Sequence, residues 1–166
     1  EAFFRNLDFD IVVSDLSSRA LYAKGQYSVP SDTACYPAKL MHGHIENLLD
    51  KGVTTIFYPC MSYNFDESKG DNHFNCPVVA YYPELLASNV EKLKQVRYLY
   101  PYLDLAERKT FPKKIWQALK EYYPDLTLRE VKRASDCAYE SYHRQREQVK
   151  EEGRKALEFA RQKGLK

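Results

Sequence analysis

A helical pattern that leads directly into a short β-branched apolar run constrains this fold more than any other feature. Residues 37–51 have the pattern of a helix, with Pro37 in the first turn, an apolar stripe and Gly52 as the end signal. Residues 53–59 have the length and composition of a buried strand, and so do residues 11–15 before the helix. A helix between two buried strands is a βαβ unit, which predicts a parallel sheet.

Further elements extend this alternation along the chain. The spacing predicts a helix over 17–24 and another strand within 96–105. Residues 77–82 fit either a strand or a helix opened by Pro77, and we favour the helix. The polar stretch 61–75 is too long for a simple turn, and loops of this length are commonly functional or mobile.

The C-terminal third of the sequence predicts helices only. One helix is expected from Phe111 to about residue 123. Thr127 and Glu130 have the spacing of a capping box, which predicts the start of a long helix over 127–163. Its apolar stripe is thin, so we expect this helix to lean on the sheet or on a neighbouring domain.

The expected architecture is therefore α/β, with a Rossmann-like, mostly parallel open sheet, flanking helices and a helical C-terminal segment. We expect an α/β lobe over 1–108, and a helical segment over 109–166 that packs on it or leads to a second lobe. The chain opens with Phe3, Phe4 and Leu7 on one helical face, like the tail of a helix, which suggests a piece of a longer polypeptide.

Charge and hydropathy exclude several classes of partner. The 166 residues include 25 basic and 23 acidic side chains, a net charge of +2, so nothing favours nucleic acid as the main partner. No secretory signal is evident, and no apolar run approaches the roughly 18 residues of a membrane span. We expect a cytoplasmic protein that binds neither nucleic acid nor membrane.

Four cysteines raise the question of chemistry, and without an export signal reduced thiols are the expected state. Cys35 precedes the helix and Cys60 follows the strand of the βαβ unit, so both should lie at the carboxyl edge of the sheet, where α/β folds bind ligands. Cys76 reaches the same edge only if Pro77 opens a helix. Cys137, inside the long helix, is expected to be core.

The histidines carry less information. His42 and His44 point to different faces of one helix, and we expect His44 to face the core and His42 to be exposed. Lys39 near the same helix start could contact a phosphate, but a lone lysine there is usually solvated. No catalytic residue can be identified.

The stretches "SDTACYPAKLMHGHIENLLDKGVTTIFYP" and "NCPVVAYYPELL" carry a family resemblance. They resemble the domain of unknown function of large CoA-substrate-specific enzyme activase proteins, which is similar to the iron–sulfur subunits of 2-hydroxyacyl-CoA dehydratases such as 2-hydroxyglutaryl-CoA dehydratase. Cys35-x-Pro37-x-Lys39, the His42-Gly43-His44 step and Cys76-Pro77 occur in order, and the resemblance covers almost the whole chain.

The resemblance implies a cofactor and a partner. In the dehydratases three cysteines hold an oxygen-sensitive 4Fe–4S cluster, and an ATP-driven activator injects an electron at low potential. Carried over, Cys35, Cys60 and Cys76 would be the ligands, and an acyl-CoA-like molecule would be the substrate. This chain has no phosphate-binding glycine loop, so the ATP-dependent activator module would lie elsewhere in the same polypeptide or in a partner, and the chain alone is expected to be inactive.

Two other functions stay open. The chain could be a non-catalytic scaffold that docks the activator modules through helix 127–163. The same thiols could instead bind zinc with His73, although their spacing matches no common zinc pattern.

Overall fold

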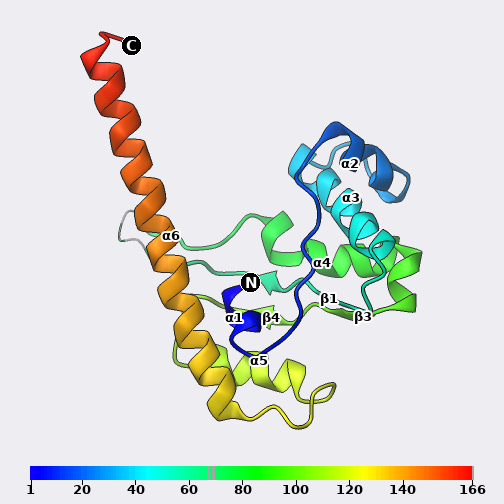
Figure 1. Cartoon of the computed structure of the whole chain (residues 1–166). Helices are drawn as coiled ribbons and strands as arrows, with labels where there is room; N and C mark the ends of the chain where they lie inside the picture. The colour runs from blue at the N-terminus through cyan, green and yellow to red at the C-terminus, as the bar shows by residue number, and fades with distance from the viewer. Residues whose placement is uncertain (67, 69, 166) are drawn as a thin grey trace. The chain divides into compact units, whose positions relative to one another are not determined.

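The computed structural model describes residues 1–66, 68 and 70–165, which form two compact units. One unit consists of Glu1–Ile11 and Thr127–Lys166, and the other of Val12–Leu126. The elements follow one another in the order α1 Ala2–Arg5, α2 Arg19–Gly25, η1 Gln26–Ser28, α3 Tyr36–Asp50, β1 Thr55–Phe57, β2 Cys60–Met61, α4 Pro77–Asn89, η2 Glu91–Gln95, β3 Arg97–Leu99, β4 Tyr102–Leu103, α5 Phe111–Leu119 and α6 Leu128–Gln162 (Figure 1).

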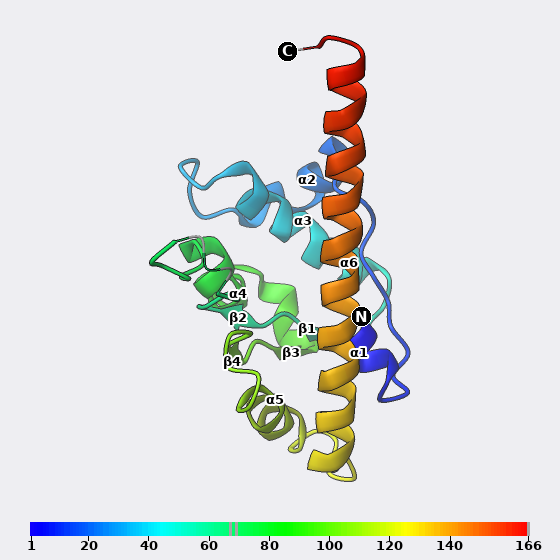
Figure 2. The ribbon, with the colours of Figure 1, turned by 90° about the vertical axis from the view of Figure 1, so that its left-hand side faces the viewer.

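The strands of the larger unit pair in parallel, as the βαβ pattern predicts. β1 pairs with β3, and β2 pairs with β4 (Figure 2). Between the two pairs the amide of Tyr58 donates to the carbonyl of Leu99, and the amide of Cys60 donates to the carbonyl of Pro101, both at 2.9 Å. The ladder is interrupted where Pro59 and Pro101 share a register, because neither proline has an N–H to donate. The two pairs are therefore successive parts of one parallel ladder.

The predicted strand at residues 11–15 is wrong, since these residues form neither helix nor strand. Val12 and Val13 are 51% and 55% exposed. The amide of Asp15 instead donates to the side-chain oxygen of Asn47 on α3, at 2.9 Å. Because α3 side chains satisfy this backbone, the segment does not extend the ladder. The fold is α/β, as predicted. In the described residues, however, the strands form two-stranded parallel sheets and not the wide open sheet that we expected.

α3 and α4 share one apolar core with β1. Pro37 lies in the first turn of α3 and Gly52 follows its end with a φ of +72°, which confirms the predicted helix. α4 begins at Pro77, so the helix-opening alternative for this segment is also confirmed. The shared core contains Ala38, Ile45, Ile56, Tyr82, Leu86, Val90 and Leu93.

α2 crosses α3 in backbone contact. A Cβ atom at Gly25 would lie 2.2 Å from the amide nitrogen of Gly43, and one at Gly43 would lie 2.0 Å from the carbonyl oxygen of Leu21. Only glycine permits this approach at either position. The predicted helix over 17–24 is observed as α2, and its N-cap Ser18 accepts a hydrogen bond from the amide of Leu21 at 3.1 Å.

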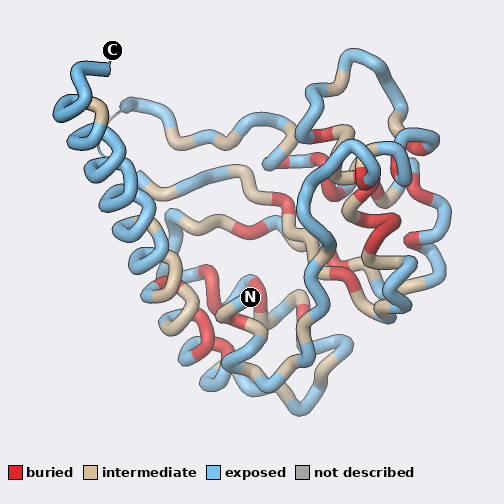
Figure 3. Tube along the Cα trace, turned by 45° about the horizontal axis from the view of Figure 1, so that its top comes forward, coloured by how far each residue is buried: buried red, intermediate tan, exposed pale blue. Residues whose placement is uncertain are grey.

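The smaller unit is formed by α1 and the long helix α6. The predicted capping box is present, since the Glu130 amide donates to Thr127 Oγ1 and the Thr127 amide donates to Glu130 Oε2. The buried residues of α6 all lie in its first part, and from residue 140 to 165 the side chains are half-buried or exposed (Figure 3). The described helices include none that is both long and apolar enough to cross a membrane.

The end of α5 also differs from prediction. α5 stops at Leu119 rather than near residue 123, and the carbonyl of Leu119 accepts from the amides of Tyr122 and Tyr123 in the closing turn. The predicted division into 1–108 and 109–166 stays a prediction.

Candidate cysteine site

Two of the candidate thiols occupy equivalent places at the starts of helices. Cys35 is the N-cap of α3 and Cys76 is the N-cap of α4, with φ and ψ of −63° and 155° and of −61° and 155°. Both residues are exposed, and neither side chain makes a capping hydrogen bond. Cysteine is not among the residues that cap helices well, whereas a helix N-terminus stabilises a thiolate or an anionic ligand. These positions therefore suit ligand binding better than helix capping.

The third thiol is buried. Cys60 lies in β2 with no exposed surface, and its amide is engaged in the ladder. Burial raises the pKa of the Cys60 thiol, while hydrogen bonding to the backbone of Glu84 and to the side chain of Tyr102 opposes that rise. Cys60 is thus held as a neutral thiol at pH 7.

The charges of the three thiols affect the pKa values of two tyrosines. Burial, followed by the charges of Cys60, Tyr82 and Cys76, raises the pKa of Tyr58 to about 12. Burial, followed by the charge of Cys35, raises the pKa of Tyr82. The charges of Cys60 and Cys76 thus act on Tyr58, and the charge of Cys35 acts on Tyr82.

Residues close in sequence to each thiol take part in the same apolar packing. Tyr58 packs against the core cluster that contains Tyr82, and so do Ala34, which precedes Cys35, and Val78, which lies two residues after Cys76. The three cysteines nevertheless do not form a preassembled metal site, since within 1–66, 68 and 70–165 no three His, Cys, Asp or Glu side chains are grouped closely enough to hold a metal ion.

Cys137 and His73 stand apart from this arrangement. Cys137 is half-buried on α6, in the other unit of the chain. His73 Nε2 lies 3.6 Å from Asp66 Oδ1 in the loop before α4, and the described residues offer no three-donor group that includes it. In the described residues neither the zinc alternative nor the iron–sulfur alternative has a preassembled site.

The histidine expectations are reversed by the structure. His42 is fully buried, and burial lowers its pKa below the usual value. His44 is only half-buried, with Ser14 Oγ 2.8 Å from Nδ1 and Ser17 Oγ 3.1 Å from Nε2. The reason is the close crossing of α2, which covers the His42 face of α3, while residues 12–18 pass over the other face. Lys39 donates to the carbonyl of Asp32 at 2.8 Å.

His42 belongs to a buried polar chain that the sequence did not reveal. Its Nδ1 lies 2.8 Å from Ser28 Oγ and its Nε2 lies 2.9 Å from the hydroxyl of Tyr82. Ser28 donates its single hydroxyl hydrogen to the carbonyl of Gly25, so it accepts from Nδ1–H, and Nε2 accepts from Tyr82. The chain ends at the tyrosine whose pKa responds to Cys35.

Glu46 is a second buried polar group that sequence reasoning missed. Its carboxylate is 3% exposed, accepts a hydrogen bond from Tyr27 and forms a 2.7 Å ion pair with Lys92. Its position four residues after His42 places both polar groups on one face of α3. Two polar residues at helical spacing on an otherwise apolar face were the available signal.

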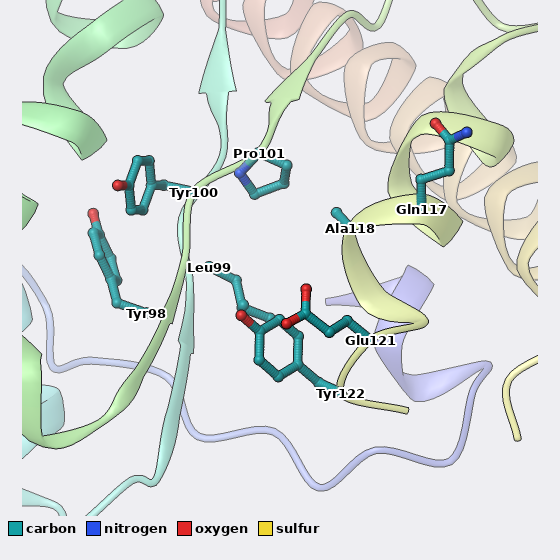
Figure 4. Close-up of a pocket in the computed structure, with 8 residues that line it drawn as sticks. All are labelled: Tyr98, Leu99, Tyr100, Pro101, Gln117, Ala118, Glu121 and Tyr122. Carbon is teal, nitrogen blue, oxygen red and sulfur yellow. The ribbon is translucent and has the colours of Figure 1, made fainter. Parts of the chain in front are cut away.

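A separate open cavity of about 270 Å³ lies between β3 with the two residues that follow it and α5 with its closing turn (Figure 4). It is lined by Tyr98, Leu99, Tyr100, Pro101, Gln117, Ala118, Glu121 and Tyr122. The rings of Tyr98 and Tyr100 have their centroids 5.2 Å apart. No cysteine lines this cavity, although Pro101 in its wall accepts a hydrogen bond from the amide of Cys60.

The comparisons with known proteins give one family. The family model of the CoA enzyme activase uncharacterised domain (DUF2229) matches residues 1–166. No curated protein and no solved structure shows a significant match to this chain.

Proposed function

Because the chain belongs to the CoA enzyme activase uncharacterised domain family, we propose that this activase-like lobe binds a 4Fe–4S cluster through Cys35, Cys60 and Cys76. The proposed role is low-potential electron transfer or radical chemistry on an acyl-CoA-like substrate. The observation that carries the proposal is the pair of matched N-cap thiols, Cys35 and Cys76, on two helices that share one apolar core, together with the buried thiol of Cys60 in β2. A bound cluster would supply one-electron transfer at a potential set by its surroundings.

The residues around the thiols suit such a cluster in their chemistry. Thiolate sulfur is the usual protein ligand of iron–sulfur clusters, and two helix N-termini would favour the negative charge of the bound group. Cys60 is already removed from water, whereas Cys35 and Cys76 are exposed and accessible to an incoming ligand. Cluster binding would require the N-cap side chains to turn towards Cys60, and the absence of capping hydrogen bonds leaves both able to rotate.

Anaerobic reconstitution tests the proposal. The protein is purified without oxygen, incubated with ferrous iron and sulfide, desalted and assayed for bound iron, bound sulfide, visible absorption and the electron paramagnetic resonance signal after reduction. We expect iron and sulfide in the ratio of a cubane cluster. Cys35→Ser, Cys60→Ala and Cys76→Ser should each lower bound iron and change the spectrum.

Cys137→Ser is the matched control, because it removes a thiol that lies in the other unit. It should bind as much iron as the parent protein. Equal iron binding by the parent and by a variant lacking Cys35, Cys60 and Cys76 would rule out the assigned ligands, as would a colourless, iron-free protein after reconstitution.

An interaction scaffold is the second candidate function. It is favoured by the exposed apolar side chains on the second part of α6, where Val149, Leu157 and Phe159 are more than half exposed. In this function α6 docks the ATP-dependent activator module of the same polypeptide or of a partner. A pull-down with that module tests it, with Val149→Asp and Leu157→Asp as disrupting changes. Retention of the module by the doubly substituted protein would contradict docking through α6.

A further inference from the structure

The buried chain Ser28–His42–Tyr82 joins the two helices that carry the N-cap thiols. His42 lies on α3 and Tyr82 lies on α4, and their 2.9 Å hydrogen bond is buried. Their rings also meet edge to face, with centroids 5.6 Å apart. A buried polar pair of this kind specifies one arrangement, because any sliding of the helices leaves a buried donor and acceptor unpaired.

The bond lies at the same depth in both helices. His42 is seven residues after Cys35, and Tyr82 is six residues after Cys76. At the rise of an α-helix, each side chain is therefore about 10 Å along the axis from its N-cap. Both helices also lead into strands of the parallel ladder, α3 into β1 and α4 through η2 into β3 (Figure 1). A bond between these two positions therefore links the two helices at similar distances from their N-caps.

Ser28 makes the arrangement specific. Ser28 accepts a hydrogen bond from Nδ1–H of His42, so the neutral imidazole carries its proton on Nδ1 and leaves Nε2 as an acceptor. Only this tautomer can receive the hydroxyl hydrogen of Tyr82. The close crossing at Gly25 and Gly43 holds η1 and its Ser28 against α3. The imidazole is thus held through Nδ1 by Ser28 of η1, and through Nε2 it binds Tyr82 of α4.

We propose that His42 and Tyr82 are positioning residues that set the register of α3 against α4, and thereby hold Cys35 and Cys76 within reach of one ligand. The role as cluster ligands rests on the proposed function, whereas the register itself is a property of the protein without metal. Neither residue needs to touch the bound group.

A cross-linking experiment on the reduced, metal-free protein tests this inference. Dibromobimane, which becomes fluorescent when both of its arms have reacted with thiols, is added to the full chain carrying Cys137→Ser. Peptide mapping by mass spectrometry then identifies the joined cysteines. We expect a Cys35–Cys76 cross-link. Tyr82→Phe should lower its rate by about fivefold, the factor that corresponds to one net protein hydrogen bond.

Three variants separate positioning from a general structural role. Tyr98→Phe removes another tyrosine hydroxyl bound to α4, at the carbonyl of Pro83, without touching α3, and should leave the rate unchanged. Ser28→Ala should lower the rate, because Nδ1 loses its partner and the ring is free to turn. His42→Gln, which keeps an amide acceptor near the position of Nε2, should retain more of the cross-link than His42→Leu.

Alkylation of the buried Cys60 reports unfolding in every variant. If Tyr82→Phe exposes Cys60, the comparison of Ser28→Ala with the parent protein carries the test. Equal cross-linking in the parent, Tyr82→Phe and Ser28→Ala with Cys60 protected, or no Cys35–Cys76 cross-link in the parent, would overturn the inference. A protein that cross-links as expected but binds no iron contradicts the proposed function and leaves the register intact.

Discussion

The Nε2 atom of His42 on α3 lies 2.9 Å from the hydroxyl oxygen of Tyr82 on α4. His42 is fully buried, and burial lowers its pKa, so the folded state holds a neutral imidazole. The His42 ring projects from α3, which starts at Cys35, and is hydrogen-bonded to α4, which starts at Cys76. A buried polar residue therefore links the two helices and makes their packing dependent on its protonation.

The free energy of unfolding should fall as the pH drops below the pKa of a histidine in the unfolded chain, which is about 6.5. The pKa of His42 is lower in the folded state, so the unfolded chain takes up the proton first, and the stability present above pH 6.5 is lost as the pH falls towards the folded value. His44, whose pKa burial also lowers, contributes in the same direction. Urea unfolding between pH 5 and 7.5 should give a slope of up to about 1.4 kcal/mol per pH unit for each histidine. An unchanged slope in His42→Gln would contradict this assignment.

Gly43→Ala should be strongly destabilising, by about 3 kcal/mol or more, because the new Cβ would lie 2.0 Å from the carbonyl oxygen of Leu21. Gly153→Ala is the matched control, since nothing lies within 4 Å of its Cβ position on α6. That change should increase the stability of the helix by about 0.5–1 kcal/mol. Circular dichroism during urea titration measures both. Equal effects of the two substitutions would disprove the α2–α3 backbone contact.

The four thiols should react with a small disulfide reagent at different rates. Cys35 and Cys76 are exposed and should react first, Cys137 is half-buried and should follow, and Cys60 should react last. Burial both shields Cys60 and raises its pKa, so little thiolate is present at pH 7. Time-resolved labelling with peptide mapping gives the order, and labelling in urea should make the four rates similar. Labelling of Cys60 as fast as Cys35 in native protein would be inconsistent with this site.

Thr127→Ala should destabilise the first turn of α6 by about 1 kcal/mol, because the Thr127 hydroxyl accepts from the Glu130 amide. Thr110→Ala, at the N-cap of α5, is the control, since the Thr110 side chain makes no capping hydrogen bond there. Amide hydrogen exchange over residues 128–135 should accelerate only in the first variant. The capping assignment fails if both variants accelerate exchange equally in their own helices.

Local signals determined several elements in advance. Pro37 with Gly52, Pro77, and the Thr127–Glu130 pair each act within one or two helical turns, so the starts of α3, α4 and α6 and the end of α3 follow from neighbouring residues alone. The β-branched run before Pro59 likewise produces β1, and its partner in β3 follows the predicted parallel pairing. The placement of Cys35 and Cys76 at helix starts depends on the same short-range signals.

Only the tertiary structure decided which residues those elements bury. The sequence makes residues 11–15 look like a strand, but a strand needs a partner, and the side chains of α3 satisfy part of this backbone instead. The sequence also cannot show which of His42 and His44 is buried. Helical periodicity puts them on different faces of α3 but does not reveal which segment covers each face. The approach of α2 at Gly43 buries His42, and Ser28 and Tyr82, far apart in the chain, supply its partners. Burial and hydrogen bonding between distant segments are properties of packing. For this reason the sequence alone predicted Cys35 and Cys76 at helix starts, whereas only the structure revealed the burial of Cys60 and the hydrogen-bonded chain Ser28–His42–Tyr82.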